Sequence, residues 1–316
     1  KKYPDRNFYV CTLAYGPSRP APIKTVPAEN VMVVNVANCL ADPDAKLSES
    51  PTLTSMQTVF DWAKVTKNQI WRPNLSNFAN SGSGGPPNIS GTIKAMKAVC
   101  PTGIIGMYID QISLNWATQG PEYYLLSQLG WDCKKDPEKI LAEYYSGFGP
   151  AAENIRAYYA LLDNSRQIIT KEKRQWLDVY TESFLSECRE QLQKAKDAVK
   201  NSPPEYAARV AFVQAGFEFL ELNTANQAFV KEILAGKDTP ETKQKMRDNF
   251  GKIEKLVKAF PYSINESNIR NPAKGRLAYI HPDADHKAMA EKEVLKQKNI
   301  EKWKKRYGLP DDGGME

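Results

Sequence analysis

The sequence predicts a parallel α/β fold followed by an all-helical region, and three observations carry this prediction. Short apolar runs alternate with polar loops and helix-like segments through residues 8–110, as in parallel sheets with helical crossovers. The run Val31–Ala37 is almost continuously apolar, which is typical of a strand buried on both faces. From Glu122 onward, apolar residues recur at the three- and four-residue spacing of amphipathic helices.

The first region contains four strand-like runs and two helix-like segments. Its first run, FYVCTLAY, ends at Gly16-Pro17, a pair that stops a strand. The helix before the third run carries Met56, Val59, Phe60 and Ala63 at helical spacing. The predicted strands are 8–15, 31–37, 69–72 and 103–110, and the predicted helices are 54–67 and 88–99.

The helical region opens with a well-marked junction. Asp136 before Pro137 predicts a helix start, because proline loses no hydrogen bond at the first helical position and aspartate can cap free N–H groups. That helix, 138–145, ends at Gly147, and Phe148-Gly149-Pro150 predicts a sharp corner before the next helix. Thr181 is a further predicted N-cap.

Three apolar stripes predict antiparallel core helices further along the chain. Beyond them, residues 276–280 could form a short strand and 287–307 a helix. His281 and His286 could hold a metal, but a surface turn is the preferred explanation. The stripes are Cys188, Leu192, Ala195 and Val199; Val210, Val213, Phe217 and Leu220; and Met246, Phe250, Ile253 and Val257.

Composition and charge narrow the functional classes. The 316 residues are 41% hydrophobic and 25% charged, as in ordinary globular proteins. No apolar run approaches the roughly 18 residues that span a membrane, and no apolar stretch of a signal peptide follows Lys1. This start fits a cytosolic chain or one whose beginning has been removed. The net charge of +6 lies mostly in 287–306, a segment explained by a solvated helix or by a polyanion-binding tail.

The five cysteines show no CxxC motif and no histidine spacing that suggests zinc. We therefore expect no metal, and no cofactor motif is visible. Buried free thiols are the default expectation, and a disulfide between Cys11 and Cys39 stays open if their strands are neighbours.

The residues of the junction match the sequence pattern of a known family. The motifs that carry the resemblance are Trp131-Asp132, Asp136-Pro137, a doubled tyrosine, FGPAA, a helix ending Leu161-Leu162-Asp163, and YAARVAF at 206–212. Through these motifs the chain resembles a bacterial family of uncharacterised function. Members look like glycoside hydrolases, with a barrel related to those of alpha-glucuronidases and hexosaminidases and a helical domain after it. The resemblance covers residues 8–235, and it implies a secreted or periplasmic location.

The resemblance implies a specific architecture. A (β/α)₈ barrel has eight strands in about 250 residues, and the sequence shows four before helices take over. The resemblance makes these the last four, so the fold class is α/β, the C-terminal half of a TIM-like barrel followed by an all-α domain. The predicted units are 1–121 (partial barrel), 122–260 (helical domain) and 261–316 (extension with a basic helix). A self-contained four-stranded α/β layer is the alternative.

In a barrel, function lies in the loops at the carboxyl ends of the strands. This rule selects polar and aromatic residues of the kinds that stack on sugar rings or bind hydroxyl groups. A structural role explains each residue alone better than a functional role, but together they favour a polar, aromatic-lined cleft. The predicted substrate-binding residues are Tyr15, Arg19, Asn35, Asn38, Trp71, Arg72, Asn74, Gln111 and Trp116.

Asp110 is the candidate catalytic residue. Glycoside hydrolysis needs two carboxyl groups, and Asp110 is the only one that the sequence places at a strand end. It shares one side of its strand with Tyr108, whereas Met107 lies on the side expected to meet the helices. The related strand of the family tends to end in glutamate-glutamine, and here it reads Asp110-Gln111. A general acid needs aromatic neighbours that raise its pKa, and Trp116 is the candidate.

Three functions follow as hypotheses. The first is a carbohydrate-active protein of glycoside-hydrolase type, acting on a polysaccharide or oligosaccharide, with its second carboxylate in an N-terminal half of the same polypeptide. The second is a non-catalytic sugar-binding or scaffold protein on a degenerate barrel. The third is an interaction module that uses the helical domain and the basic tail. No nucleic-acid partner and no membrane span are expected.

Overall fold

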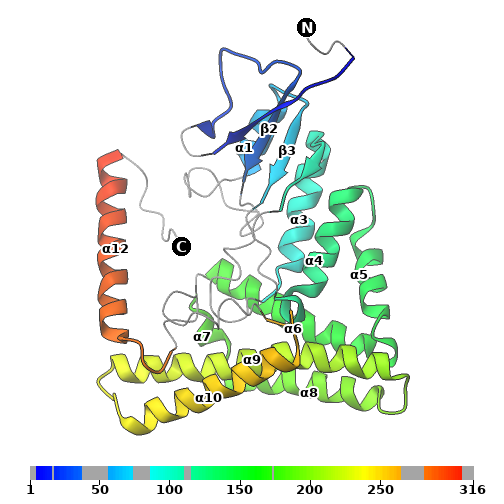
Figure 1. Cartoon of the computed structure of the whole chain (residues 1–316). Helices are drawn as coiled ribbons and strands as arrows, with labels where there is room; N and C mark the ends of the chain where they lie inside the picture. Colours follow the sequence, from blue (N-terminus) through cyan, green and yellow to red (C-terminus); the bar gives the residue numbers. More distant parts are fainter. Residues whose placement is uncertain are drawn as a thin grey trace.

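The computed structural model describes residues 5–15, 18–37, 56–73, 86–109, 115–172, 174–264 and 281–307 (Figure 1). A small sheet lies at one end of the molecule and long helices form the other end. No helix within these ranges combines the length and the apolar character that crossing a bilayer would require. The predicted strand 276–280 and the C-terminal tail lie outside the described residues.

The sheet has four parallel strands in the order β1-β2-β3-β4, so the predicted parallel α/β arrangement is confirmed. Strand β4 is much shorter than predicted, because only Gly106 and Met107 pair with their neighbours on β3. The strands are β1 (Val10–Ala14), β2 (Val31–Val36), β3 (Gln69–Arg72) and β4 (Gly106–Met107).

Three helices cover one face of the sheet: α1 (Met56–Ala63), α3 (Ile89–Val99) and α4 (Trp116–Trp131). The side chains of Trp71 and Met107 pack against these helices in the main core. Because side chains alternate along a strand, Arg72 and Tyr108 lie on the other side of the sheet, which we call the far face. The predicted packing of Met107 and Ile109 against the helices is confirmed, whereas Ile105, predicted to lie on the same side, is exposed.

Within the described residues, the chain after the sheet is helical, as predicted for the region from Glu122 onward. Asp136 caps α5 by accepting from the backbone N–H of Glu138 at 3.0 Å, and Thr181 caps α8 by accepting from Phe184 at 3.3 Å. Both predicted caps are confirmed. The elements are α5 (Pro137–Ser146), α6 (Ala152–Glu172), α7 (Trp176–Val179), α8 (Glu182–Ala198), α9 (Pro204–Leu234), α10 (Pro240–Ala259), α12 (His286–Tyr307), and the 3₁₀ turns η2 (Cys100–Thr102) and η3 (Gly149–Ala151).

One main core joins the sheet to the helical region. It runs from Trp71 of β3 through Leu126 of α4 to Tyr158 of α6 and Leu220 of α9. Smaller cores lie between α9 and α10 and between β1, β2 and α1. The predicted boundary at 121/122 falls inside α4, and the main core crosses it.

The corner at residues 148–150 is built for close packing. Gly149 has a φ of 56°, which favours glycine, and an added Cβ would lie 2.8 Å from the ring of Tyr206 on α9. Arg209, one turn further along α9, donates to the carbonyl of Gly147. The junction motif and YAARVAF, which are far apart in the sequence, are thus one packed contact.

Helix α12 lies at the left of Figure 1 and contacts α9. His281 lies in the turn before this helix, and His286 is its first residue. The His281 ring packs edge-on against Phe250, with centroids 5.0 Å apart, whereas His286 is buried. The expected surface turn is therefore wrong for His286, because this side chain is covered at the start of the helix.

Candidate functional site

The carboxyl end of the sheet carries a stacked arginine and tyrosine on the far face. The Cζ atom of Arg72 lies 5.1 Å from the centroid of the Tyr108 ring, within the range of a cation–π contact. The backbone N–H of Tyr108 donates to the carbonyl of Trp71 at 2.9 Å, which holds the tyrosine beside the end of β3. More than half of the Tyr108 surface is exposed, so its ring is available to a ligand.

A second arginine and tyrosine follow β1. The Arg19 Cζ atom lies 5.7 Å from the centroid of the exposed Tyr15 ring. The Arg19 carbonyl accepts from Nε1 of Trp62 at 2.7 Å, which attaches this loop to α1. Burial lowers the pKa of the Arg19 guanidinium, although the nearby Tyr15 acts in the opposite direction. Tyr15, Arg19 and Arg72 therefore lie at the carboxyl end of the sheet or in the loop after it.

Asn35 and Trp71 are placed differently, because both are fully buried on the helix-covered face. Nδ2 of Asn35 donates to the carbonyl of Thr58 on α1 and to Oε1 of Gln69, each at 3.1 Å. Nε1 of Trp71 donates to the carbonyl of Ala37 at 2.9 Å. The bond to Thr58 attaches α1 to the sheet, and the bond to Ala37 joins β3 to the end of β2. Both side chains therefore have structural roles away from the far face.

Trp116 is the first residue of α4 rather than part of a loop. Its ring is partly exposed and packs edge-on against Tyr123, with centroids 4.9 Å apart. The other predicted site residues, Asp110, Asn38, Asn74 and Gln111, lie outside the described residues.

A buried carboxylate that the sequence reasoning did not single out lies near the start of α3. Glu122 of α4 is 1% exposed and accepts hydrogen bonds from the backbone of Asn88 and from the hydroxyl of Thr92. Burial raises the pKa of its carboxyl group, and the two hydrogen bonds oppose that shift. No motif marked this residue, because its burial depends on how α3, α4 and α6 pack.

Tyr108 was also missing from the predicted site, although the sequence held a signal for it. Tyr108 is two residues before Asp110 in the sequence, so the alternation used to predict the side of Asp110 applies to Tyr108 as well. Among the described residues, no group of three or more His, Cys, Asp or Glu side chains is arranged to hold a metal ion.

The cysteine pairing differs from the one left open by the sequence. Cys100 and Cys133 form a disulfide, and Cys11 and Cys188 are free. A Cys11–Cys39 bond is therefore wrong for this structure. The expectation of a buried free thiol is confirmed for Cys188, whereas Cys11 is exposed.

The described fold and site define a class: a parallel α/β protein with one helix-covered face, fused to a helical region. Within it, the chain belongs to the family described as "Domain of unknown function (DUF4838)", whose sequence model matches residues 1–160. The match covers the whole sheet and continues into α6. Comparisons with curated proteins and with solved structures find no match. A family of uncharacterised function is thus confirmed, and its description names no activity.

Proposed function

We propose that this protein is carbohydrate-active, of the glycoside-hydrolase type, and that its strands are the second half of a (β/α)₈ barrel. The observation that carries the proposal is the order of the sheet. Four parallel strands follow one another in chain order, and α1, α3 and α4 all lie on one face. A (β/α)₈ barrel has this arrangement, whereas a doubly wound sheet reverses its strand order and carries helices on both faces.

The two edges of the sheet support closure by further strands. Edge strand β1 exposes about half of Val10 and of Leu13, which lie on opposite faces. At the other edge, Ile105 before β4 is exposed, and Trp131 at the end of α4 is 90% exposed. Exposed apolar edges favour pairing with more chain. An upstream half-barrel would cover both edges at once, whereas a self-contained four-stranded layer would leave them in water.

The side chains at the carboxyl end support a sugar ligand. Tyr108 and Tyr15 offer exposed rings for stacking on a sugar face, and the adjacent Arg72 and Arg19 offer several N–H donors for hydroxyl groups. The sequence pattern predicts that Asp110, two residues beyond Tyr108, shares its side of the strand, and we propose Asp110 as the catalytic acid. The second carboxyl group would come from the upstream half, about 5–10 Å from Asp110.

The test uses the full-length protein with a panel of polysaccharides and aryl glycosides. We expect turnover that Asp110→Asn abolishes, and binding that Tyr108→Ala weakens by about tenfold through loss of stacking. Tyr9→Ala is the matched control: Tyr9 is 57% exposed and Tyr108 is 55% exposed, but Tyr9 precedes β1, at the opposite end of the sheet. The finding of neither turnover nor binding would refute the proposal.

One observation favours a second candidate, a non-catalytic sugar-binding protein. Among the described residues, those on the far face at the carboxyl ends of the strands, Val36, Arg72 and Tyr108, carry no carboxyl group. Saturable binding that Tyr108→Ala weakens, without turnover of any substrate in the panel, would support this candidate. The interaction-module hypothesis predicts instead that deletion of residues 287–316 abolishes binding of a protein partner.

A further inference from the structure

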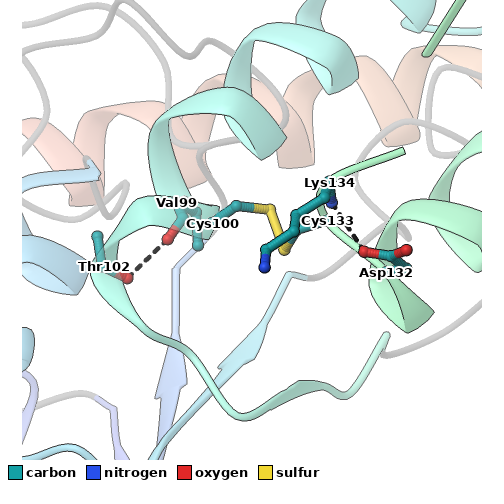
Figure 2. Close-up of a disulfide and its surroundings, with 6 residues drawn as sticks. All are labelled: Val99, Cys100, Thr102, Asp132, Cys133 and Lys134. Atoms are coloured by element: carbon teal, nitrogen blue, oxygen red, sulfur yellow. Dashed lines mark hydrogen bonds between the residues drawn. A yellow bond between two sulfur atoms is a disulfide. The ribbon is translucent and has the colours of Figure 1, made fainter. Parts of the chain in front are cut away.

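The Cys100–Cys133 disulfide connects the two segments that flank β4. Cys100 begins η2, directly after α3, and Cys133 lies two residues after the end of α4 (Figure 2). The two Cα atoms are 5.8 Å apart across a separation of 33 residues. The bond therefore closes a loop that contains β4, the segment after it and the whole of α4.

Both cysteines lie in turns that have hydrogen bonds of their own. Oγ1 of Thr102 donates to the carbonyl of Val99 at 2.7 Å. After α4, the backbone N–H of Lys134 donates to Oδ1 of Asp132 at 3.0 Å, and Nζ of Lys135 donates to Oε1 of Gln128 at 2.6 Å. These bonds hold the two cysteines in place independently of the disulfide, so the fold brings them together.

Strand β4 has few other restraints. Its pairing covers two residues, and the flanking N–H groups of Ile105 and Tyr108 each donate to a β3 carbonyl at 2.9 Å. β3 is its sole strand neighbour in the described sheet. On the helix-covered face, Met107 lies against Gly130 of α4. An edge strand this short is expected to fray, and a covalent bond between its two flanking helices limits that motion.

We infer that the disulfide is a clamp on β4 and that the protein folds and acts in an oxidising compartment. Cys133 is exposed and Cys100 is partly exposed, so soluble thiols can reach the bond. A reducing cytosol would keep such a pair as thiols. The clamp also supports the strand that carries Tyr108, although this inference stands without a sugar ligand.

The compartment is tested on protein from its source cells. Cells are treated with iodoacetamide at harvest, before any reduction, and the digest is analysed by mass spectrometry. We expect a peptide linked through Cys100 and Cys133, and an alkylated Cys11 as the internal control for labelling. Alkyl groups on both Cys100 and Cys133 would overturn the assignment to an oxidising compartment.

The clamp is tested by hydrogen exchange before and after reduction with dithiothreitol. We expect the amides of Ile105 and Tyr108 to exchange at least about tenfold faster after reduction, and the amide of Val33 in β2 to change little. The Tm should fall on the order of 5–10 °C. The Cys100→Ala/Cys133→Ala variant should not respond to dithiothreitol, whereas Cys11→Ala should respond like the wild type. Unchanged exchange at Ile105 and Tyr108 after reduction would overturn the clamp.

Discussion

The carboxylate of Glu122 accepts a hydrogen bond from the backbone N–H of Asn88 at 2.9 Å, at the N-cap of α3. The Asn88 side chain does not cap this helix, because its Oδ1 accepts from Gln167 of α6 at 2.9 Å. Thr92 Oγ1 donates to the other oxygen of Glu122 at 3.0 Å. The Glu122 side chain of α4 therefore takes the place of a local N-cap, and its hydrogen bonds connect α3 to α4.

Removal of this carboxylate should destabilise the fold. Glu122→Ala leaves the Asn88 N–H and the Thr92 hydroxyl buried without their acceptor, so we expect a loss of about 2–4 kcal/mol in the free energy of unfolding. Urea titration followed by circular dichroism measures it. Glu153→Ala, at an exposed carboxylate of α6 that pairs with Arg156, should change stability by less than about 0.5 kcal/mol. Equal effects of the two variants would contradict the capping role.

The same group predicts a pH dependence. Burial raises the pKa of Glu122, so the folded protein holds a proton where the unfolded chain, with a pKa near 4.5, has lost it. The contribution of Glu122 to stability is therefore full below pH 4.5 and is lost as pH rises through the folded pKa. We expect the wild type to lose stability relative to Glu122→Gln as the pH rises over that range. Parallel stability curves in urea titrations at successive pH values would exclude the shift.

The corner at Gly149 predicts a steric effect. Gly149→Ala places a Cβ 2.8 Å from the Tyr206 ring at a φ of 56°, so we expect a loss of about 1–3 kcal/mol. Gly251→Ala is the matched control, because a Cβ at this position of α10 meets nothing within 4 Å. That variant should be neutral or more stable by up to about 1 kcal/mol. Thermal unfolding compares the two, and a neutral Gly149→Ala would refute the packing argument.

Cys11 and Cys188, the free thiols among the described residues, should differ in reactivity. Burial raises the pKa of Cys188 to about 12, so little thiolate forms near neutral pH. Cys11 is exposed on β1. Iodoacetamide at pH 8 should label Cys11 in the native protein and Cys188 only after unfolding in urea, as measured by peptide mass spectrometry. Labelling of native Cys188 at the rate of Cys11 would contradict its burial.

Local signals explain which elements could be predicted. The starts of α5 and α8 depend on Asp136 and Thr181, whose side chains bond to amides two and three residues ahead. The amphipathic stripes depend on the helical repeat alone, and all their members are buried, including Cys188 and Phe217. Such interactions lie within one turn of the chain, so the sequence is sufficient to predict them.

The rule that function lies at the carboxyl ends of strands identified candidate residues at one end of the sheet, but it did not say on which face each side chain lies. Arg72 and Trp71 are adjacent in β3, yet Arg72 lies on the far face and Trp71 is buried under the helices. A shift of one residue reverses the face of every side chain in a strand. Near β4, Met107 and Ile109 pack against the helices as predicted, whereas Ile105 does not. In β2, Val34, Asn35 and Val36 are all buried, so the polarity of the residues did not indicate which face each side chain occupies.

The sequence by itself determined where helices and strands form, where two helices begin, and which residues of α8, α9 and α10 enter the core, because these depend on periodicity and on neighbours within a turn. Only the tertiary structure decided that Cys100 pairs with Cys133 and that Glu122 caps α3. The partners in those contacts are 33 and 34 residues apart. They meet only after β4 and α4 have packed, since a chain of that length can close in many other ways.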